Sequence, residues 1–198
     1  MLLKNRPILL LFVSYFCMNY VWYFFFAWLY LYLAEVRGFT LLESGFLGAL
    51  PMLAGAGTAW LGGEVCQRAC QRLGPCWGCR MPVMAGLTGV AVFLTAVVLT
   101  PNRYVAVAML TACYSFLTFT DCIYWQGATY IAGRYTSSAC GILNTGGNLA
   151  GIVGTPLTAL LFAQLGWTVA LGAGVVFALL GATLWLFIRV DEPLVAYE

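Results

Sequence analysis

The sequence contains no histidine and very little charge. Asp, Glu, Lys and Arg together make up 8% of its 198 residues. The absence of histidine excludes Ser–His and Cys–His catalytic pairs, the H-E-x-x-H zinc motif and haem ligation by histidine. A G-x-x-x-x-G-K-[ST] phosphate loop is also absent, which excludes a nucleotide-driven pump built from this chain alone. These absences argue against an enzyme, and no cofactor is expected.

Apolar residues take the place of the missing charge. They make up 63% of the chain. Charged residues make up only 8%, whereas they account for about 25% of a soluble domain. Uncharged apolar runs recur along the whole sequence, and only a bilayer makes such a composition favourable. The sequence therefore predicts an integral membrane protein, with the lipid bilayer as a partner. The net charge of +2 is small and dispersed, so no nucleic-acid partner is expected.

Several apolar segments are long enough to cross a bilayer as helices, each of which needs about 20 residues. The predicted spans are about 8–34, 41–63, 81–100, 104–131, 138–164 and 167–188. A transmembrane β-barrel would show alternating segments of about 10 residues, and these runs are longer and do not alternate. We therefore predict an all-α membrane protein with one six-helix transmembrane domain over residues 1–198.

The basic residues predict the orientation of these spans. Six spans place both termini on one side of the membrane. That side would carry Lys4, Arg6, Arg68, Arg72, Arg80, Arg134 and Arg189, and the other side only Arg37 and Arg103. Cytoplasmic loops are enriched in lysine and arginine, so both termini are predicted to be cytoplasmic, in a plasma (inner) membrane.

The segment CGILNTGGNLAGIVGTP, residues 140–156, is unusually polar for its apolar surroundings. Positions i, i+3, i+4 and i+7 share one face of an α-helix. Asn144, Gly147, Asn148 and Gly151 therefore form one stripe, opposite the leucines and valines of the segment. Small residues commonly line the contacts between membrane helices. Close packing and a polar cavity wall are both open interpretations of this stripe.

Asp121 is the only acidic residue well inside a predicted span. A charge at that depth is costly and by default indicates a functional residue that faces a cavity or a partner. Trp125 follows one helical turn later on the same face, together with several hydroxyl residues. A narrower stripe in the first span contains Asn19 and Tyr23. A protonated Asp121 that only stabilises the bundle is the open alternative.

Four cysteines cluster between the second and third predicted spans. The segment EVCQRACQRLGPCWGCR contains Cys66, Cys70, Cys76 and Cys79. Four thiolates can hold zinc, but zinc modules usually separate their two pairs by about 12–20 residues. Here only five residues lie between Cys70 and Cys76. Juxtamembrane palmitoylation in a eukaryotic host is a second alternative. The preferred interpretation is a tight, reduced loop, and no metal site is predicted.

Three further segments carry a family resemblance. SACGILNTGGNLAGIVGTP followed by GWTVAL and LWLFI is similar to the eleventh and twelfth helices of one transporter family. YFFFAWLYLYLAEVRGFTLLESGFLGALP resembles its seventh and eighth helices, and YWQGATYIAGRYTSSA the end of its tenth. The whole chain thus resembles the C-terminal six-helix half of a major facilitator superfamily transporter. Within that superfamily it resembles the anion:cation symporters, which include hexuronate, galactonate, glucarate and sialin-like carriers.

The resemblance implies a secondary active transporter for a small organic anion, either a sugar acid or another carboxylate. Transport would proceed by alternating access and be coupled to a proton or a cation. The asparagines would donate amide hydrogen bonds to the substrate, and the tryptophan would pack against it. Asp121 departs from the family, which often has a small residue there, and it would hold a proton or orient a hydroxyl. The expected substrate-binding residues are Asn144, Asn148, Trp125, Asp121, Asn19 and Tyr23.

The resemblance also implies a missing partner. Transporters of this kind bind their substrate at the midplane, between two repeated halves. We therefore expect the chain to need an N-terminal-half polypeptide, or a second copy of itself, to form a pathway. A non-transporting membrane subunit or a truncated remnant is the main alternative. An intramembrane enzyme that acts on a lipid-like substrate is a weaker one.

Overall fold

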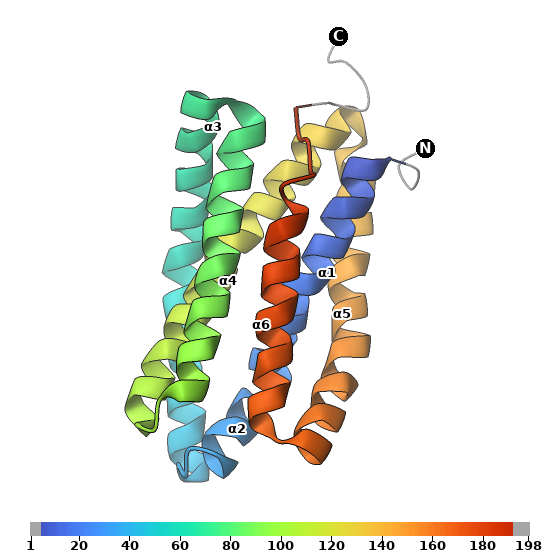
Figure 1. The fold of residues 1–198 in the computed structure, drawn as a ribbon. Coiled ribbons are helices and arrows are strands. Elements are labelled where there is room, and N and C mark those ends of the chain that lie inside the picture. The colour runs from blue at the N-terminus through green and yellow to red at the C-terminus, as the bar shows by residue number, and fades with distance from the viewer. Residues whose placement is uncertain (1–4, 192–198) are drawn as a thin grey trace.

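A computed structural model describes residues 5–191 of the protein, which form helices joined by short connections (Figure 1). The elements are α1 (Arg6–Ala27), α2 (Leu29–Glu35), α3 (Leu41–Leu99), α4 (Arg103–Ala132), the 3-10 helix η2 (Gly133–Tyr135), α5 (Thr136–Leu165) and α6 (Trp167–Leu184). No strand occurs in this described part of the chain, which confirms the all-α prediction. Lys4, which contributes to the predicted charge distribution, lies outside the described residues.

Three of the helices begin at residues that can cap them. Asn5 accepts a hydrogen bond from the backbone of Ile8 at the start of α1. Thr40 and Glu43 form a reciprocal capping box at the start of α3. Asn102 accepts from two backbone N–H groups in the first turn of α4. These side chains satisfy N–H groups that have no partner within the helix.

The first predicted span, 8–34, is divided in the structure. α1 ends at Ala27, because Trp28 has a non-helical conformation (φ −124°, ψ −15°), and α2 then continues for seven residues. The Trp28 indole Nε1 donates to the backbone carbonyl of Thr155 on α5, at 3.2 Å. Neither glycine nor proline marks this break, so a contact between distant segments accompanies a kink that has no local sequence signal.

The second and third predicted spans, 41–63 and 81–100, belong to one element in the structure. α3 is helical throughout, except at Gly74 (φ 79°, ψ 164°). Glycine adopts a positive φ at little cost, and Pro75 has no backbone N–H to continue the helical pattern. The two arms of α3, before and after Gly74, fold back on one another (Figure 1). The predicted cysteine loop is therefore wrong, because these residues are helical up to the reversal and after it.

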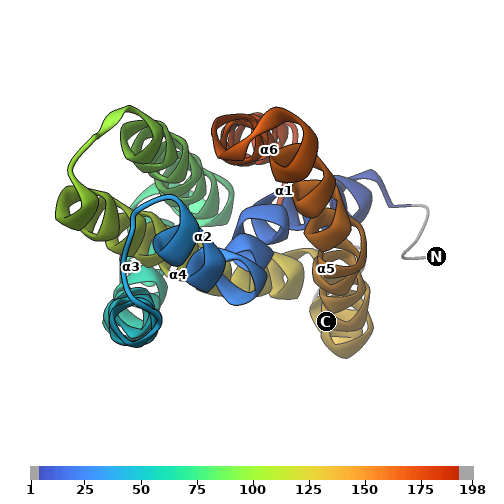
Figure 2. The same cartoon turned by 90° about the horizontal axis from the view of Figure 1, so that it is seen from below.

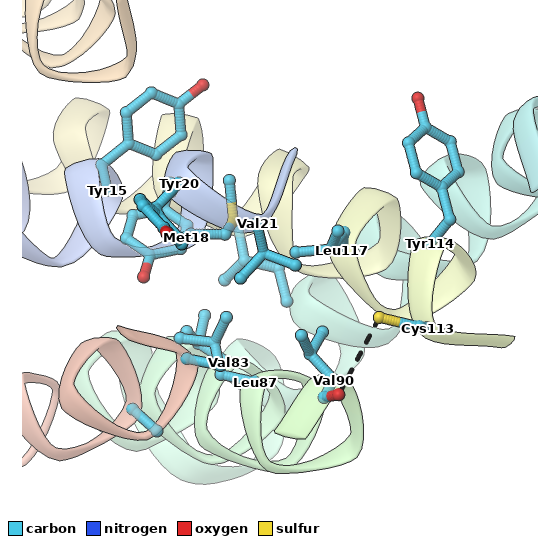
Figure 3. Packing of buried hydrophobic residues seen from close by; sticks show 14 of the residues in the cluster. Tyr15, Met18, Tyr20, Val21, Val83, Leu87, Val90, Cys113, Tyr114 and Leu117 are labelled. Carbon is cyan, nitrogen blue, oxygen red and sulfur yellow. Dashed lines mark hydrogen bonds between the residues drawn. The ribbon is translucent and has the colours of Figure 1, made fainter. Parts of the chain in front are cut away.

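The helices form two packing groups. α3 packs chiefly on α4, and α1 packs on α5 and α6 (Figure 2). Between the groups, the buried residues Val83, Leu87 and Val90 of α3 face Val21 of α1 and Leu117 of α4 (Figure 3). An aliphatic core thus joins the two groups along the middle of the bundle.

The connections between the helices lie at the two ends of the bundle. The start of α1, the reversal of α3, the junction of α4 with α5 and the end of α6 lie at one end (Figure 1). α2 and the connection from α3 to α4 lie at the other end. Most basic residues therefore belong to segments at the first end, while Arg37 and Arg103 belong to segments at the second.

The lengths of the helices suit a bilayer. Among the described residues, four continuous helical stretches are long and apolar enough to cross a membrane, namely Arg6–Ala27, Leu41–Leu99, Arg103–Leu165 and Trp167–Leu184. A straight helix of 59 residues would reach about 89 Å, far beyond a hydrocarbon core of about 30 Å. The reversal of α3 resolves this mismatch. The chain is thus a helical integral membrane protein, and its six crossings stay a prediction.

Replacement of Gly62 by alanine tests the packing of α3 on α4. A Cβ atom at this position would lie 2.1 Å from the backbone oxygen of Phe119. Because a backbone carbonyl cannot rotate aside like a side chain, the two helices must separate. Overpacking typically costs about 1–3 kcal/mol, so we expect a lower apparent Tm for the detergent-solubilised protein in fluorescence-detected size-exclusion chromatography.

Gly57→Ala is the matched control for this substitution. It lies on the same arm of α3, and a Cβ there meets no atom within 4 Å. Alanine is a better helix former than glycine, so this variant should be as stable as the original protein or more stable. Equal Tm values for Gly62→Ala and the original protein would contradict the close contact.

Candidate functional site

A pocket of about 240 Å³ lies between α1 and α5. Pockets for drug-sized ligands have volumes of about 300–1,000 Å³, so this one suits a smaller molecule. Its lining combines aromatic rings with three carboxamides. The lining residues are Tyr15, Asn19, Trp22, Tyr23 and Phe26 from α1, and Asn144, Gly147 and Asn148 from α5.

Glycines of α5 allow the aromatic residues of α1 to come close. A Cβ at Gly147 would lie 2.9 Å from the ring of Tyr15, and one at Gly151 would lie 2.4 Å from the ring of Tyr23. The absence of side chains at these positions lets the rings rest on the α5 backbone. The asparagines of the same stripe then border the pocket. One face of α5 therefore both packs against α1 and lines the pocket with polar groups.

Hydrogen bonds hold most of the carboxamides in place. The hydroxyl of Tyr23 donates to Oδ1 of Asn148 at 3.3 Å, and Nδ2 of Asn148 donates to the backbone oxygen of Asn144 at 3.0 Å. Nδ2 of the buried Asn19 donates to the backbone oxygen of Tyr15 at 2.9 Å. The side chain of Asn144 is exposed at the edge of the pocket, where its amide can donate two hydrogen bonds to a ligand.

Asp121 lies beside this pocket, on α4. Its Oδ1 accepts from the hydroxyl of Tyr15 at 2.9 Å, and its Oδ2 accepts from Nε1 of Trp125 at 3.2 Å. The rings of Tyr15 and Trp125 also meet nearly edge to face, with centroids 5.7 Å apart. Figure 3 shows the Tyr15 hydroxyl pointing away from the aliphatic core. Tyr15 therefore links the pocket to the carboxyl group.

The predicted site residues divide into two sets. One set lines the pocket and consists of Asn19, Tyr23, Asn144 and Asn148. The other set, Asp121 and Trp125, does not line it and reaches it only through Tyr15.

Three pocket residues were given no role in the sequence-based prediction. Tyr15, Trp22 and Phe26 complete the α1 wall of the pocket. Their spacing of three or four residues from predicted site residues places them on the same helix face. That spacing was the available signal, and Tyr15 and Phe26 belong to the same stripe of the first span as Asn19.

Part of the polar stripe on α4 serves helix packing instead. The hydroxyl groups of Thr118 and Thr58 of α3 lie 2.7 Å apart, within hydrogen-bonding distance. The Cys122 thiol donates to the backbone oxygen of Ala59 at 3.1 Å. These two positions of the α4 stripe therefore pack against α3.

The arrangement is suited to binding a small polar molecule. Neutral amide donors can hydrogen-bond to carboxylate or hydroxyl oxygens, and flat aromatic rings can cover the apolar part of a ligand. The neighbouring carboxyl group can take up or release a proton. Such a site can recognise and release a ligand without making or breaking its covalent bonds.

The known proteins to which this chain is similar are named as transporters. A sequence profile of the Major Facilitator Superfamily matches residues 1–136. The probable sulfoacetate transporter SauU of Cupriavidus necator is 35% identical over 152 residues, which cover 76% of this chain and 35% of that protein. The chloroplastic ascorbate transporter of Arabidopsis thaliana is 27% identical over 195 residues, which cover 98% and 36%.

A third relative agrees with these two. The probable galactarate/D-glucarate transporter GudP of Escherichia coli is 28% identical over 162 residues, which cover 79% of this chain and 34% of that protein. The chain thus spans about a third of the length of these relatives, between 34% and 36%. All three are named as transporters, not as enzymes.

A solved structure has the same fold. A crystal structure of a variant of the peptide transporter POT in complex with sulfate superposes with a TM-score of 0.73. The match covers 95% of this chain and 38% of that chain, at 15% sequence identity. A likeness at this identity concerns the fold alone, and it shows that the helices of this chain are arranged like those of the matched part of that structure.

Replacement of Gly151 by alanine tests the contact that shapes the pocket. The new Cβ would lie 2.4–2.8 Å from three atoms of the Tyr23 ring. The ring must therefore move, which breaks its hydrogen bond to Asn148. Because the displaced atoms are the far end of a side chain and not backbone, we expect the free energy of unfolding to fall by about 1 kcal/mol, the low end of the range for overpacking, in a titration with sodium dodecyl sulfate.

Gly141→Ala on the same helix is the control, because a Cβ there meets no atom within 4 Å. Its free energy of unfolding should equal or exceed that of the original protein. If both variants behave alike, Tyr23 does not lie against α5.

Proposed function

Because the chain belongs to the major facilitator superfamily, we propose that it forms one six-helix half of a secondary transporter for a small organic anion. The supporting observation is the carboxamide-lined pocket between α1 and α5. Asn148 lies twelve residues after the start of α5, or about 18 Å along a helix of about 45 Å. Transporters of this kind bind their substrates near the bilayer midplane, and the position of Asn148 along α5 supports the proposal.

The exposed side of this pocket needs a cover. Asn144 and Asn148 are exposed on a long apolar helix, and lipid offers their amides no hydrogen-bonding partner. We propose that this face borders a water-filled cavity, opposite a complementary N-terminal half or a second copy of the chain. The two units would open alternately to the two sides of the membrane. The greater length of the relatives, of which the chain spans 34–36%, supports this proposal.

The chemistry of the pocket favours a small carboxylate or sugar acid. Neutral N–H donors of the asparagines would bind the anionic and hydroxyl oxygens without holding them so tightly that release is slow. Ligand binding in the pocket would act on Tyr15, whose hydroxyl donates to Asp121. Asp121 would carry the coupling proton, and Trp125 would support both groups. Relatives named for sulfoacetate, ascorbate and galactarate or glucarate transport agree with an anionic substrate.

The orientation follows from the distribution of charge. The end of the bundle that carries most arginines would face the cytoplasm, because translocated loops are poor in basic residues. Both termini would then be cytoplasmic, in a plasma or bacterial inner membrane.

Substitution of Asn144 by alanine tests the assigned pocket. A lost hydrogen bond to a charged ligand costs about 1.5–3 kcal/mol, which corresponds to a loss of about ten- to hundredfold in apparent affinity. Uptake of labelled sulfoacetate and galactarate would be measured in proteoliposomes that contain this chain and a complementary half.

The matched control is Thr145→Ala, whose hydroxyl donates to the backbone of Gly141 and does not line the pocket. Its uptake should equal that of the original protein. Equal uptake by Asn144→Ala and the original protein would remove Asn144 from the site, and no uptake by any pairing of halves would favour a non-transporting subunit.

Replacement of Asp121 by asparagine tests the coupling role. Asparagine has nearly the same shape but cannot exchange a proton, so uptake driven by a pH gradient should fall about tenfold or more. Exchange of labelled for unlabelled substrate without a gradient should continue, because it needs no net proton movement. An equal loss of both activities would show that Asp121 only supports the fold. Proteoliposome assays with and without an imposed pH gradient separate these outcomes.

A further inference from the structure

Three cysteine thiols meet beside the reversal of α3. The Sγ atoms of Cys66 and Cys70 lie 3.9 Å apart, those of Cys66 and Cys79 lie 3.7 Å apart, and those of Cys70 and Cys79 lie 3.8 Å apart. The three sulfur atoms thus form a nearly equilateral triangle. Cys66 and Cys79 are buried, and Cys70 is partly exposed. All three are free thiols.

The backbone holds this triangle in place. Cys66 and Cys70 are one helical turn apart on the first arm of α3, so their side chains share a face. The reversal at Gly74 brings the second arm back alongside them. A Cβ at Gly78 would lie 2.4 Å from the backbone N and Cα atoms of Cys70, so the two arms are in direct backbone contact. Cys79 follows this contact immediately and completes the triangle.

The size of the triangle matches a zinc–thiolate site. Zinc binds thiolate sulfur at about 2.3 Å in tetrahedral geometry, which places neighbouring sulfur atoms about 3.8 Å apart. The three measured separations of 3.7–3.9 Å therefore correspond to one face of such a tetrahedron. Sulfur ligands are also those that select zinc among the common divalent ions.

We propose that Cys66, Cys70 and Cys79 bind one Zn²⁺ ion as thiolates, with the fourth position taken by a ligand other than cysteine. Binding displaces three thiol protons, so three neutral thiols and Zn²⁺ become a complex of net charge −1 and three released protons. Arg72 in the same segment supplies positive charge nearby in the chain, whereas Arg68 forms an ion pair with Glu64 at 2.8 Å. The ion would clip the two arms of α3 together at one end of the bundle.

The fourth cysteine of the segment takes no part in this site. The Sγ atom of Cys76 lies 4.0 Å from the backbone oxygen of Ile188, toward which its thiol donates. Arg80 donates to the same carbonyl at 2.8 Å. Cys76 therefore contacts the residues that follow α6. Because it belongs to the same stretch of α3 as the other three cysteines, it provides a matched control.

Zinc titration of the chain tests this proposal. The protein, purified in detergent with a non-thiol reductant and stripped of metal, would compete with a chromogenic chelator for added Zn²⁺. We expect one ion per chain, a Kd below about one micromolar, and a higher apparent Tm with zinc. Co²⁺ in place of Zn²⁺ should give the thiolate-to-metal charge-transfer absorption in the near ultraviolet.

The variants locate the site. Cys66→Ser and Cys79→Ser should each lower the zinc affinity by about a hundredfold or more and weaken the charge-transfer band, because loss of a direct ligand exceeds the 10–100-fold effect of an outer-shell change and leaves only two thiolates. Cys70→Ser, at the partly exposed position, gives the same test should a buried variant fail to fold. Cys76→Ser should bind zinc like the original protein. Absence of stoichiometric binding, or an equal loss in Cys76→Ser, would overturn the assignment.

Discussion

Close contact between aromatic side chains of α1 and the glycine face of α5 is the interaction on which the rest of the site depends. Lipid tails are as apolar as leucine, so the association of membrane helices relies on close packing rather than on the hydrophobic effect. The glycines of α5 supply that closeness for four rings of α1. The paired residues are Gly146 with Phe12, Gly147 with Tyr15, Gly151 with Tyr23 and Gly154 with Tyr20. Asn144 and Asn148, on the same face as Gly147 and Gly151, border the pocket because the two helices lie so near.

Tyr15 connects the two packing groups of the bundle. Its ring belongs to the contact between α1 and α5, while its hydroxyl donates to Asp121 on α4, which packs on α3. A carboxyl group held by neutral donors can change its protonation state without breaking an ion pair. In the proposed transport cycle, a ligand in the pocket and a proton on Asp121 would therefore act on the same tyrosine, from opposite sides.

The reversal of α3 has consequences at one end of the molecule. It turns an element of 59 residues into two arms of bilayer length, and it brings together thiols that are up to thirteen residues apart in the chain. The spacing rule for zinc modules assumes two pairs of ligands presented by short loops. It does not describe this segment, in which the three sulfur atoms come from two antiparallel helical arms and the fourth cysteine contacts the residues after α6.

The sequence by itself determined the class of the protein and much of one helix face. Its composition indicated a membrane protein, and its long, non-alternating apolar runs favoured helices over a β-barrel, the other structure that satisfies its backbone hydrogen bonds within lipid. Helical periodicity placed the two asparagines of α5 on one stripe with Gly147, and the regular helix preserves that pattern. The reversal beside Gly74 was also encoded locally, in a glycine followed by a proline.

Only the tertiary structure decided what those faces meet. Periodicity assigns a residue to a side of its own helix, but the rotation of one helix against another depends on the packing of all of them. For this reason Asp121, which stands out in the sequence, lies behind the pocket, and Tyr15 forms the link to it. The break at Trp28 also has no local signal. It accompanies a contact with Thr155, which is distant in the chain.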